Sequence, residues 1–219
     1  MGVFDIIGPV MIGPSSSHTA GAVRLARLAR SVLGADPVRA RIGLHGSFAR
    51  TYRGHGTDRA LAGGLLGLDP DDERIVEALE LARRSGLALE FAAVELADAH
   101  PNTAVIELTD AAGRTVTVTG SSVGAGRVMV TRIDDYLVQL TGAYHTLLVA
   151  HKDQPGMVSR VTGLLALADV NIAAMRVARR DRGAQALTLI ETDQAVRQDV
   201  LDTIAELPQV NWALMVPPI

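Results

Sequence analysis

The chain has 219 residues and a hydrophobic content of 48%, enough for one large core or two small ones, which excludes a disordered or fibrous protein. Its formal charge of -3 and aromatic content of 3% provide neither a basic surface nor stacking platforms, so we expect no nucleic-acid partner. With 0 cysteines, the chain alone forms no disulfide and offers no thiolate to a nucleophilic, zinc or iron-sulfur site, so any cluster must come from a partner.

The N-terminal segment shows no secretion signal. Met1–Asp5 lacks a basic n-region, and no apolar run in the chain is long enough to span a bilayer. We therefore expect a cytoplasmic protein with no membrane partner.

Loops rich in glycine or hydroxyl side chains alternate with helices in the first part of the chain. The run Ser15–Thr19 offers several N-caps, and the segment after it places apolar residues on one helical face and arginines on another. Arg39–Leu44 predicts a short strand. The loop Gly54–Asp58 then leads into a helix predicted from Ala60 to Leu66.

Beyond this helix the pattern changes from helix to strand. Asp69-Pro70 predicts the start of one more helix, which ends at Gly86. Four later segments favour strands, namely Leu89–Phe91, Val105–Ile106, Thr115–Val118 and Arg127–Ile133. The first domain, residues 1–142, is therefore predicted to be mixed α/β, with helices followed by a largely antiparallel sheet.

Residues 143–219 predict a second domain with the ferredoxin-like order βαββαβ, so the fold class is α+β. The predicted elements are strands Tyr144–Ala150, Val170–Ala178, Ala186–Ile190 and Val210–Val216, and helices after Gly156 and at Val196–Leu207. The first of these helices is predicted to bury Val158, Val161, Leu164, Leu165 and Leu167. Small sheets of this kind often pair edge to edge, so self-association is expected, with or without a ligand.

The hydroxyl-rich loop and its histidine are a candidate anion site. Backbone N–H groups at a helix N-terminus could hold the carboxylate of an amino acid beside His18, together with the side chains of Ser15, Ser16, Ser17 and Thr19. The alternative is that one serine caps the helix and His18 is an exposed bystander.

Two further histidines lie in loops. His55 stands between two glycines and suits proton transfer near neutral pH, while Asp58 could orient its ring or cap the next helix. His100-Pro101-Asn102-Thr103 predicts a rigid polar corner, useful for binding or for ending an element. These dispersed histidines lack the close helical spacing of a zinc site, so we expect no metal bound by this chain.

Taken in order, the motifs Gly13-Pro14-Ser15-Ser16-Ser17-His18-Thr19, Gly54-His55-Gly56-Thr57-Asp58 and His100-Pro101-Asn102-Thr103 resemble the β subunit of bacterial iron-sulfur-dependent L-serine dehydratase. The C-terminal part, with Asp153-Gln154-Pro155-Gly156 and Asn171-Ile172, resembles an ACT domain. The first domain also resembles the allosteric substrate-binding domain of some D-3-phosphoglycerate dehydrogenases. The bulky, charged run Arg50–Arg53 before Gly54 departs from the family pattern.

The resemblance implies a lyase that converts L-serine to pyruvate and ammonia with a 4Fe-4S cluster held by cysteines of a separate α subunit. It implies His55 as the proton acceptor, His18 with Ser15, Ser16, Ser17 and Thr19 as substrate-positioning groups, and His100 and Asn102 as secondary contacts. It also implies an amino-acid effector site at Asp153, Gln154, Gly156, Asn171 and Ile172. The alternative is a purely regulatory amino-acid-binding module. A free-standing hydrolase would need a nucleophile, base and acid that we cannot assemble from the sequence.

Overall fold

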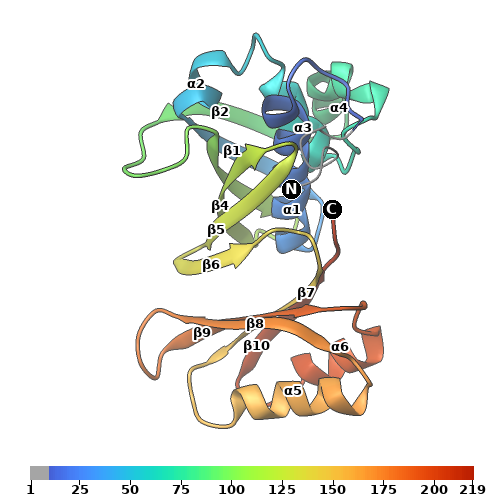
Figure 1. Ribbon diagram of the computed structural model, residues 1–219, viewed down its shortest axis with the longest axis vertical. Coiled ribbons are helices and arrows are strands. Elements are labelled where there is room, and N and C mark those ends of the chain that lie inside the picture. Colours follow the sequence, from blue (N-terminus) through green and yellow to red (C-terminus); the bar gives the residue numbers. More distant parts are fainter. Residues whose placement is uncertain (1–9) are drawn as a thin grey trace. The chain divides into compact units, whose positions relative to one another are not determined.

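The computed structural model describes residues 10–219, which divide into two compact units (Figure 1). The first comprises the residues up to Asp134 together with Gln139–Thr141, and the second comprises Asp135–Val138 with Gly142–Ile219. The predicted absence of a signal at Met1–Asp5 concerns a segment outside the described residues. Within residues 10–219, no helix is both long and apolar enough to cross a membrane.

The first unit contains a long helix and several short ones. The helices are η2 (Ser16–Ala20), α1 (Gly21–Leu33), α2 (Gly46–Thr51), α3 (Thr57–Leu65), η3 (Glu73–Glu77) and α4 (Ala78–Arg84). Helix α1 has the predicted amphipathic pattern and buries its apolar face. It ends where Gly34 turns left-handed and donates its N–H to the Arg30 carbonyl.

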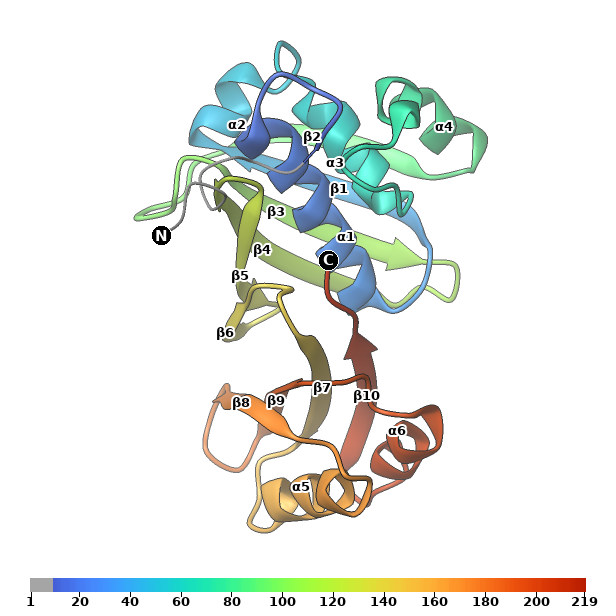
Figure 2. The same ribbon diagram turned by 45° about the vertical axis from the view of Figure 1, so that its right-hand side comes forward.

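The other layer is a six-stranded sheet, whose first five strands belong wholly to this unit. Its strands are β1 (Pro37–His45), β2 (Ala88–Val94), β3 (Thr103–Asp110), β4 (Thr115–Gly124), β5 (Arg127–Ile133) and β6 (Tyr136–Leu140), in the order β2-β1-β3-β4-β5-β6. Strands β1 and β2 pair in parallel, whereas β1 with β3, β3 with β4 and β4 with β5 pair antiparallel. Helix α1 packs on β3, β4 and β5, as Figure 2 shows.

The second unit has the predicted βαββαβ order. Its elements are β7 (His145–Lys152), α5 (Met157–Leu167), β8 (Ile172–Arg179), β9 (Gln185–Thr192), α6 (Gln198–Ala205) and β10 (Val210–Val216). The antiparallel sheet runs β10-β7-β9-β8, which leaves β8 and β10 at its edges. A core of Leu147, Val149, Val161, Leu165 and Ile204 joins the sheet to both helices. The prediction of an α+β fold is confirmed.

Two local predictions were wrong. Asp69-Pro70 does not begin a helix, because the Pro70 carbonyl accepts the Ile12 N–H, and the next helical turn starts after Asp72, whose side chain accepts the Arg74 N–H. In α5, Leu167 was predicted to be buried but is 87% exposed. It is the last residue of the helix, on the side turned away from the core of Val161 and Leu165.

Candidate functional site

The hydroxyl-rich run before α1 is itself a π-helical turn, η2, and it buries His18. The Ser15 side chain accepts the backbone N–H of His18 at 3.2 Å, and the Ser15 carbonyl accepts the Thr19 N–H at 2.8 Å. His18 is only 9% exposed, so it is not the exposed bystander of the alternative interpretation. Turns of this type are uncommon and often mark functional positions.

His18 meets His55, although 36 residues separate them in the sequence. Their ring centroids are 4.9 Å apart with the planes at 76°, and the Phe48 ring contacts His18 at 5.3 Å in the same edge-to-face manner. His55 lies in the turn between α2 and α3 and is exposed. The fold therefore brings one buried and one exposed imidazole together.

The two rings differ in how they are held. Nδ1 of His18 lies 3.3 Å from the Ser15 hydroxyl and Nε2 lies 3.1 Å from the Ser47 hydroxyl. Within residues 10–219 no hydrogen bond engages the His55 ring. One imidazole is thus anchored at both nitrogens, and the other is free to meet a ligand.

Burial lowers the pKa of His18 below its ordinary value of 6.5, and the nearby charge of His55 lowers this pKa further. His18 is consequently neutral at pH 7. A neutral ring can donate one hydrogen bond and accept another, which matches the two hydroxyls beside it.

The other predicted hydroxyl groups divide by position. The Thr19 hydroxyl is buried, lies against Gly13 and has no hydrogen-bond partner among the described residues. Ser16 and Ser17 are half-buried in the same turn.

Asp58 neither orients His55 nor serves as the N-cap of α3. Gly56 occupies the cap position, and the Asp58 carboxylate accepts the Arg59 N–H.

The corner at His100 reaches the site through its backbone. His100 Nδ1 accepts the Asn102 N–H at 3.1 Å within its own loop, and the Pro101 carbonyl accepts the Ser47 N–H at 2.7 Å. Ser47 was missed as a site residue in the sequence. The signal for it is its place beside Gly46 directly after a predicted strand.

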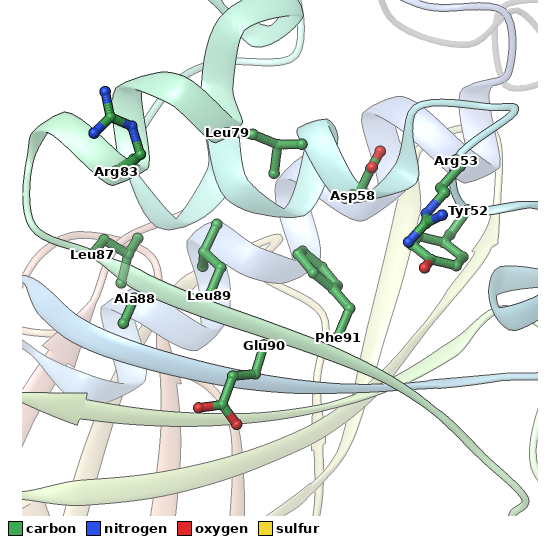
Figure 3. A pocket seen from close by; sticks show the side chains of 10 residues that line it. All are labelled: Tyr52, Arg53, Asp58, Leu79, Arg83, Leu87, Ala88, Leu89, Glu90 and Phe91. Atoms are coloured by element: carbon green, nitrogen blue, oxygen red, sulfur yellow. The ribbon is translucent and has the colours of Figure 1, made fainter.

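A separate cavity of about 700 Å³ lies along the edge strand β2 (Figure 3). Its lining includes Tyr52, Arg53, Asp58, Leu79, Arg83, Leu89 and Phe91, and none of the predicted catalytic or substrate-binding residues. Tyr52 stacks on Phe91 with centroids 6.2 Å apart, and the Arg53 guanidinium lies over Tyr52. The bulky run before Gly54 therefore packs against β2.

The predicted effector residues lie at the two ends of α5. At the N-terminal end, the Asp153 carboxylate accepts the Gly183 N–H at 2.9 Å, Gln154 contacts Met157, and Gly156 precedes the helix. At the other end, Asn171 donates to Asp193 at 2.7 Å and precedes Ile172. Eleven helical residues span about 16 Å, so one chain does not gather all five around one small ligand.

The chain's own residues do not fit a cysteine-ligated iron-sulfur cluster. The sequence has 0 cysteines. Among residues 10–219 no group of three or more histidine or acidic side chains is placed to hold a metal ion.

Comparison with known proteins identifies both units. A family model described as "Serine dehydratase beta chain" matches residues 2–86, and one described as "ACT domain" matches residues 145–209. The "Probable L-serine dehydratase, beta chain" of Bacillus subtilis is 46% identical over 208 residues, 95% of this chain and 94% of that protein.

Two further relatives extend the comparison. The "L-serine dehydratase, beta chain" of Peptoniphilus asaccharolyticus is 38% identical over 96% of this chain and 95% of its own length. A "D-3-phosphoglycerate dehydrogenase" of Mycobacterium bovis is 28% identical over 67% of this chain and 28% of its own length. Alignment along nearly the whole of both β chains shows that the chain belongs to the family of L-serine dehydratase β chains, and the second family model identifies an ACT domain within its second unit.

Proposed function

We propose that this chain is the β subunit of an L-serine dehydratase, a lyase that forms pyruvate and ammonia, and that it contributes polar groups to a site shared with an α subunit. The observation that carries the proposal is the pair His18 and His55: the first ring is anchored and buried, and the second is exposed and has no hydrogen bond to any residue from 10 to 219. An incomplete constellation of this kind suits a surface that is completed by a partner.

His55 is the proposed proton acceptor. Its ring is exposed in a glycine-flanked turn and is free of hydrogen bonds within residues 10–219, so it can approach the α-proton of a bound amino acid. His18, whose two ring nitrogens face the Ser15 and Ser47 hydroxyls, is a fixed ring beside His55 that shapes the place of the substrate and offers it no free ring nitrogen. Ser16 and Ser17 beside it are further candidates for substrate contact, and Thr19 supports the turn from within.

The 4Fe-4S cluster is assigned to the α subunit, because this chain has no cysteine to ligate it. When bound, such a cluster supplies Lewis-acid chemistry at the serine hydroxyl. The role of this chain is to orient the substrate and to hold or accept a proton at the His55 ring. We expect the isolated β subunit to be inactive on L-serine.

Amino-acid sensing is assigned to the ACT domain, with self-association as part of it. A ligand that contacts both Asp153 and Asn171 needs a second copy, since these residues lie at opposite ends of α5. The edge strand β8 supports such pairing, because Met175 and Val177 remain 44% and 41% exposed on it. In the alternative, the chain is only this regulatory module and contributes no catalytic group.

Anaerobic co-expression with the α subunit tests the proposal. L-Serine turnover is measured for the native pair, for His55→Gln, and for His145→Gln, which changes a histidine at the start of β7 in the other unit. Loss of general-base catalysis predicts a fall in kcat of about 10²- to 10⁴-fold for His55→Gln with the complex and the cluster absorbance intact. Native turnover in His55→Gln would leave the regulatory alternative.

A further inference from the structure

Both ring nitrogens of His18 face a serine hydroxyl. The Ser15 hydroxyl, 3.3 Å from Nδ1, belongs to the same turn, whereas the Ser47 hydroxyl, 3.1 Å from Nε2, comes from α2. A neutral imidazole has one donor and one acceptor nitrogen, and a hydroxyl can serve either. The two bonds therefore fix the plane and position of the ring whichever tautomer it adopts.

Ser47 is itself held by the backbone of another loop. Its N–H donates to the Pro101 carbonyl at 2.7 Å, and its own carbonyl accepts the Thr51 hydroxyl at 2.9 Å. The bond to the Pro101 carbonyl requires glycine at position 46, where φ is +58° and an added Cβ would lie 2.7 Å from the Pro101 oxygen. These bonds fix the backbone of Ser47 at the place from which its hydroxyl reaches Nε2 of His18.

The Ser47 hydroxyl is not used for helix capping. The N-cap of α2 is His45, which makes no side-chain cap bond, and Ser47 is the second residue of the helix. Its hydroxyl bonds His18 across 29 residues. A hydroxyl retained only to start the helix would bond a nearby backbone N–H instead.

We propose that Ser47 is a positioning residue, which holds Nε2 of His18 so that the ring faces substrate beside His55. This inference rests on the proposed function and deepens it. The His100-Pro101-Asn102 corner then supports Ser47 through the Pro101 carbonyl, which accepts the Ser47 N–H. His100 stabilises this corner from within, because its Nδ1 accepts the Asn102 N–H.

Kinetics of the assembled enzyme test the inference. We compare native enzyme with Ser47→Ala, with the isosteric pair Ser47→Thr and Ser47→Val, and with Ser85→Ala, which removes a hydroxyl that donates to the Ala82 carbonyl. Loss of one hydrogen bond to a binding group predicts a roughly tenfold fall in kcat/KM, mainly through KM, for the Ala and Val variants. Ser47→Thr should restore most of it, and Ser85→Ala should behave as native. Native kinetics in Ser47→Ala would overturn the inference.

A second readout does not depend on activity. In the full chain labelled with ¹⁵N-histidine, Ser47→Ala should shift or broaden the His18 Nε2 resonance, while Ser85→Ala leaves it unchanged. An unchanged His18 resonance in Ser47→Ala would refute the positioning role even if serine turnover were found. If the native pair shows no serine turnover but the His18 resonance responds, the proposed function fails and the contact stands. If Ser47→Ala does not fold, the Thr and Val variants decide both tests.

Discussion

Gly64→Ala should separate α3 from α1 and so disturb the histidine pair. An added Cβ at Gly64 would lie 2.3 Å from the Val23 carbonyl oxygen and 2.7 Å from the Ala26 Cβ, so the two helices must move apart. Helix α1 follows the turn of His18, and α3 follows the loop of His55. The approach at Gly64 therefore helps to set the distance between the two rings.

The magnitude follows from two opposed effects. Overpacking against backbone costs about 3 kcal/mol, at the upper end of the usual range. Replacing glycine by alanine inside a helix returns about 1 kcal/mol. A net loss of about 2 kcal/mol corresponds to a fall in Tm of roughly 4 to 8 °C for a chain of this size.

Gly63→Ala is the matched control. It changes the neighbouring residue of the same helix, but its added Cβ meets the Ile75 side chain at 3.2 Å, which can adjust. Thermal unfolding is followed by far-UV circular dichroism, and the fluorescence of Trp212, the single tryptophan, reports on the other unit. Equal melting temperatures for Gly64→Ala and Gly63→Ala would refute the packing argument. A destabilised Gly64→Ala enzyme with native kinetics at low temperature would refute its link to the histidines.

Two further predictions concern the ACT domain and the pKa of His18. Gly163→Ala should stabilise the ACT domain by about 0.5 to 1 kcal/mol, because alanine favours a helix interior over glycine and the added Cβ meets no atom within 4 Å. Urea unfolding followed by Trp212 fluorescence measures the change. An unchanged or lower urea midpoint would contradict this prediction. His55→Gln should raise the pKa of His18 without restoring its ordinary value, since burial, the larger cause, remains. The pKa of His18 lies below 6.5 in the folded chain and at its ordinary 6.5 in the unfolded chain, so between these two pKa values the unfolded chain binds more protons. The free energy of unfolding therefore rises with pH across this interval and stays level above 6.5. In His55→Gln the folded pKa moves up toward 6.5, so the interval becomes narrower. NMR titration of His18 measures the shift, and an unchanged pKa would exclude the contribution of His55.

Sequence patterns alone gave most of the elements, since periodic burial and turn residues report local structure. The strand Val210–Val216 was predicted with the bounds that the structure has, and the βαββαβ order of the second unit followed from alternation and turn signals. The helix at Asp69-Pro70 failed for a non-local reason, because the Pro70 carbonyl is engaged by Ile12. Exposure of Leu167 likewise depends on where the core ends.

Except for Ser47, the candidate residues of the site could also be named from the sequence, since histidine and hydroxyl groups in glycine-bearing loops are visible without a fold. Their arrangement could not. Leu44 pairs with Ala104 in the antiparallel β1–β3 ladder, so the loop after β1 and the loop before β3 lie at the same end of these two strands. This arrangement places Pro101 against Ser47. Which loops meet is decided by strand order and helix packing, which are long-range interactions that no local pattern encodes. The sequence by itself determined the local elements and the chemistry available in the loops, and only the tertiary structure decided that His18 is anchored by Ser47 beside the exposed ring of His55.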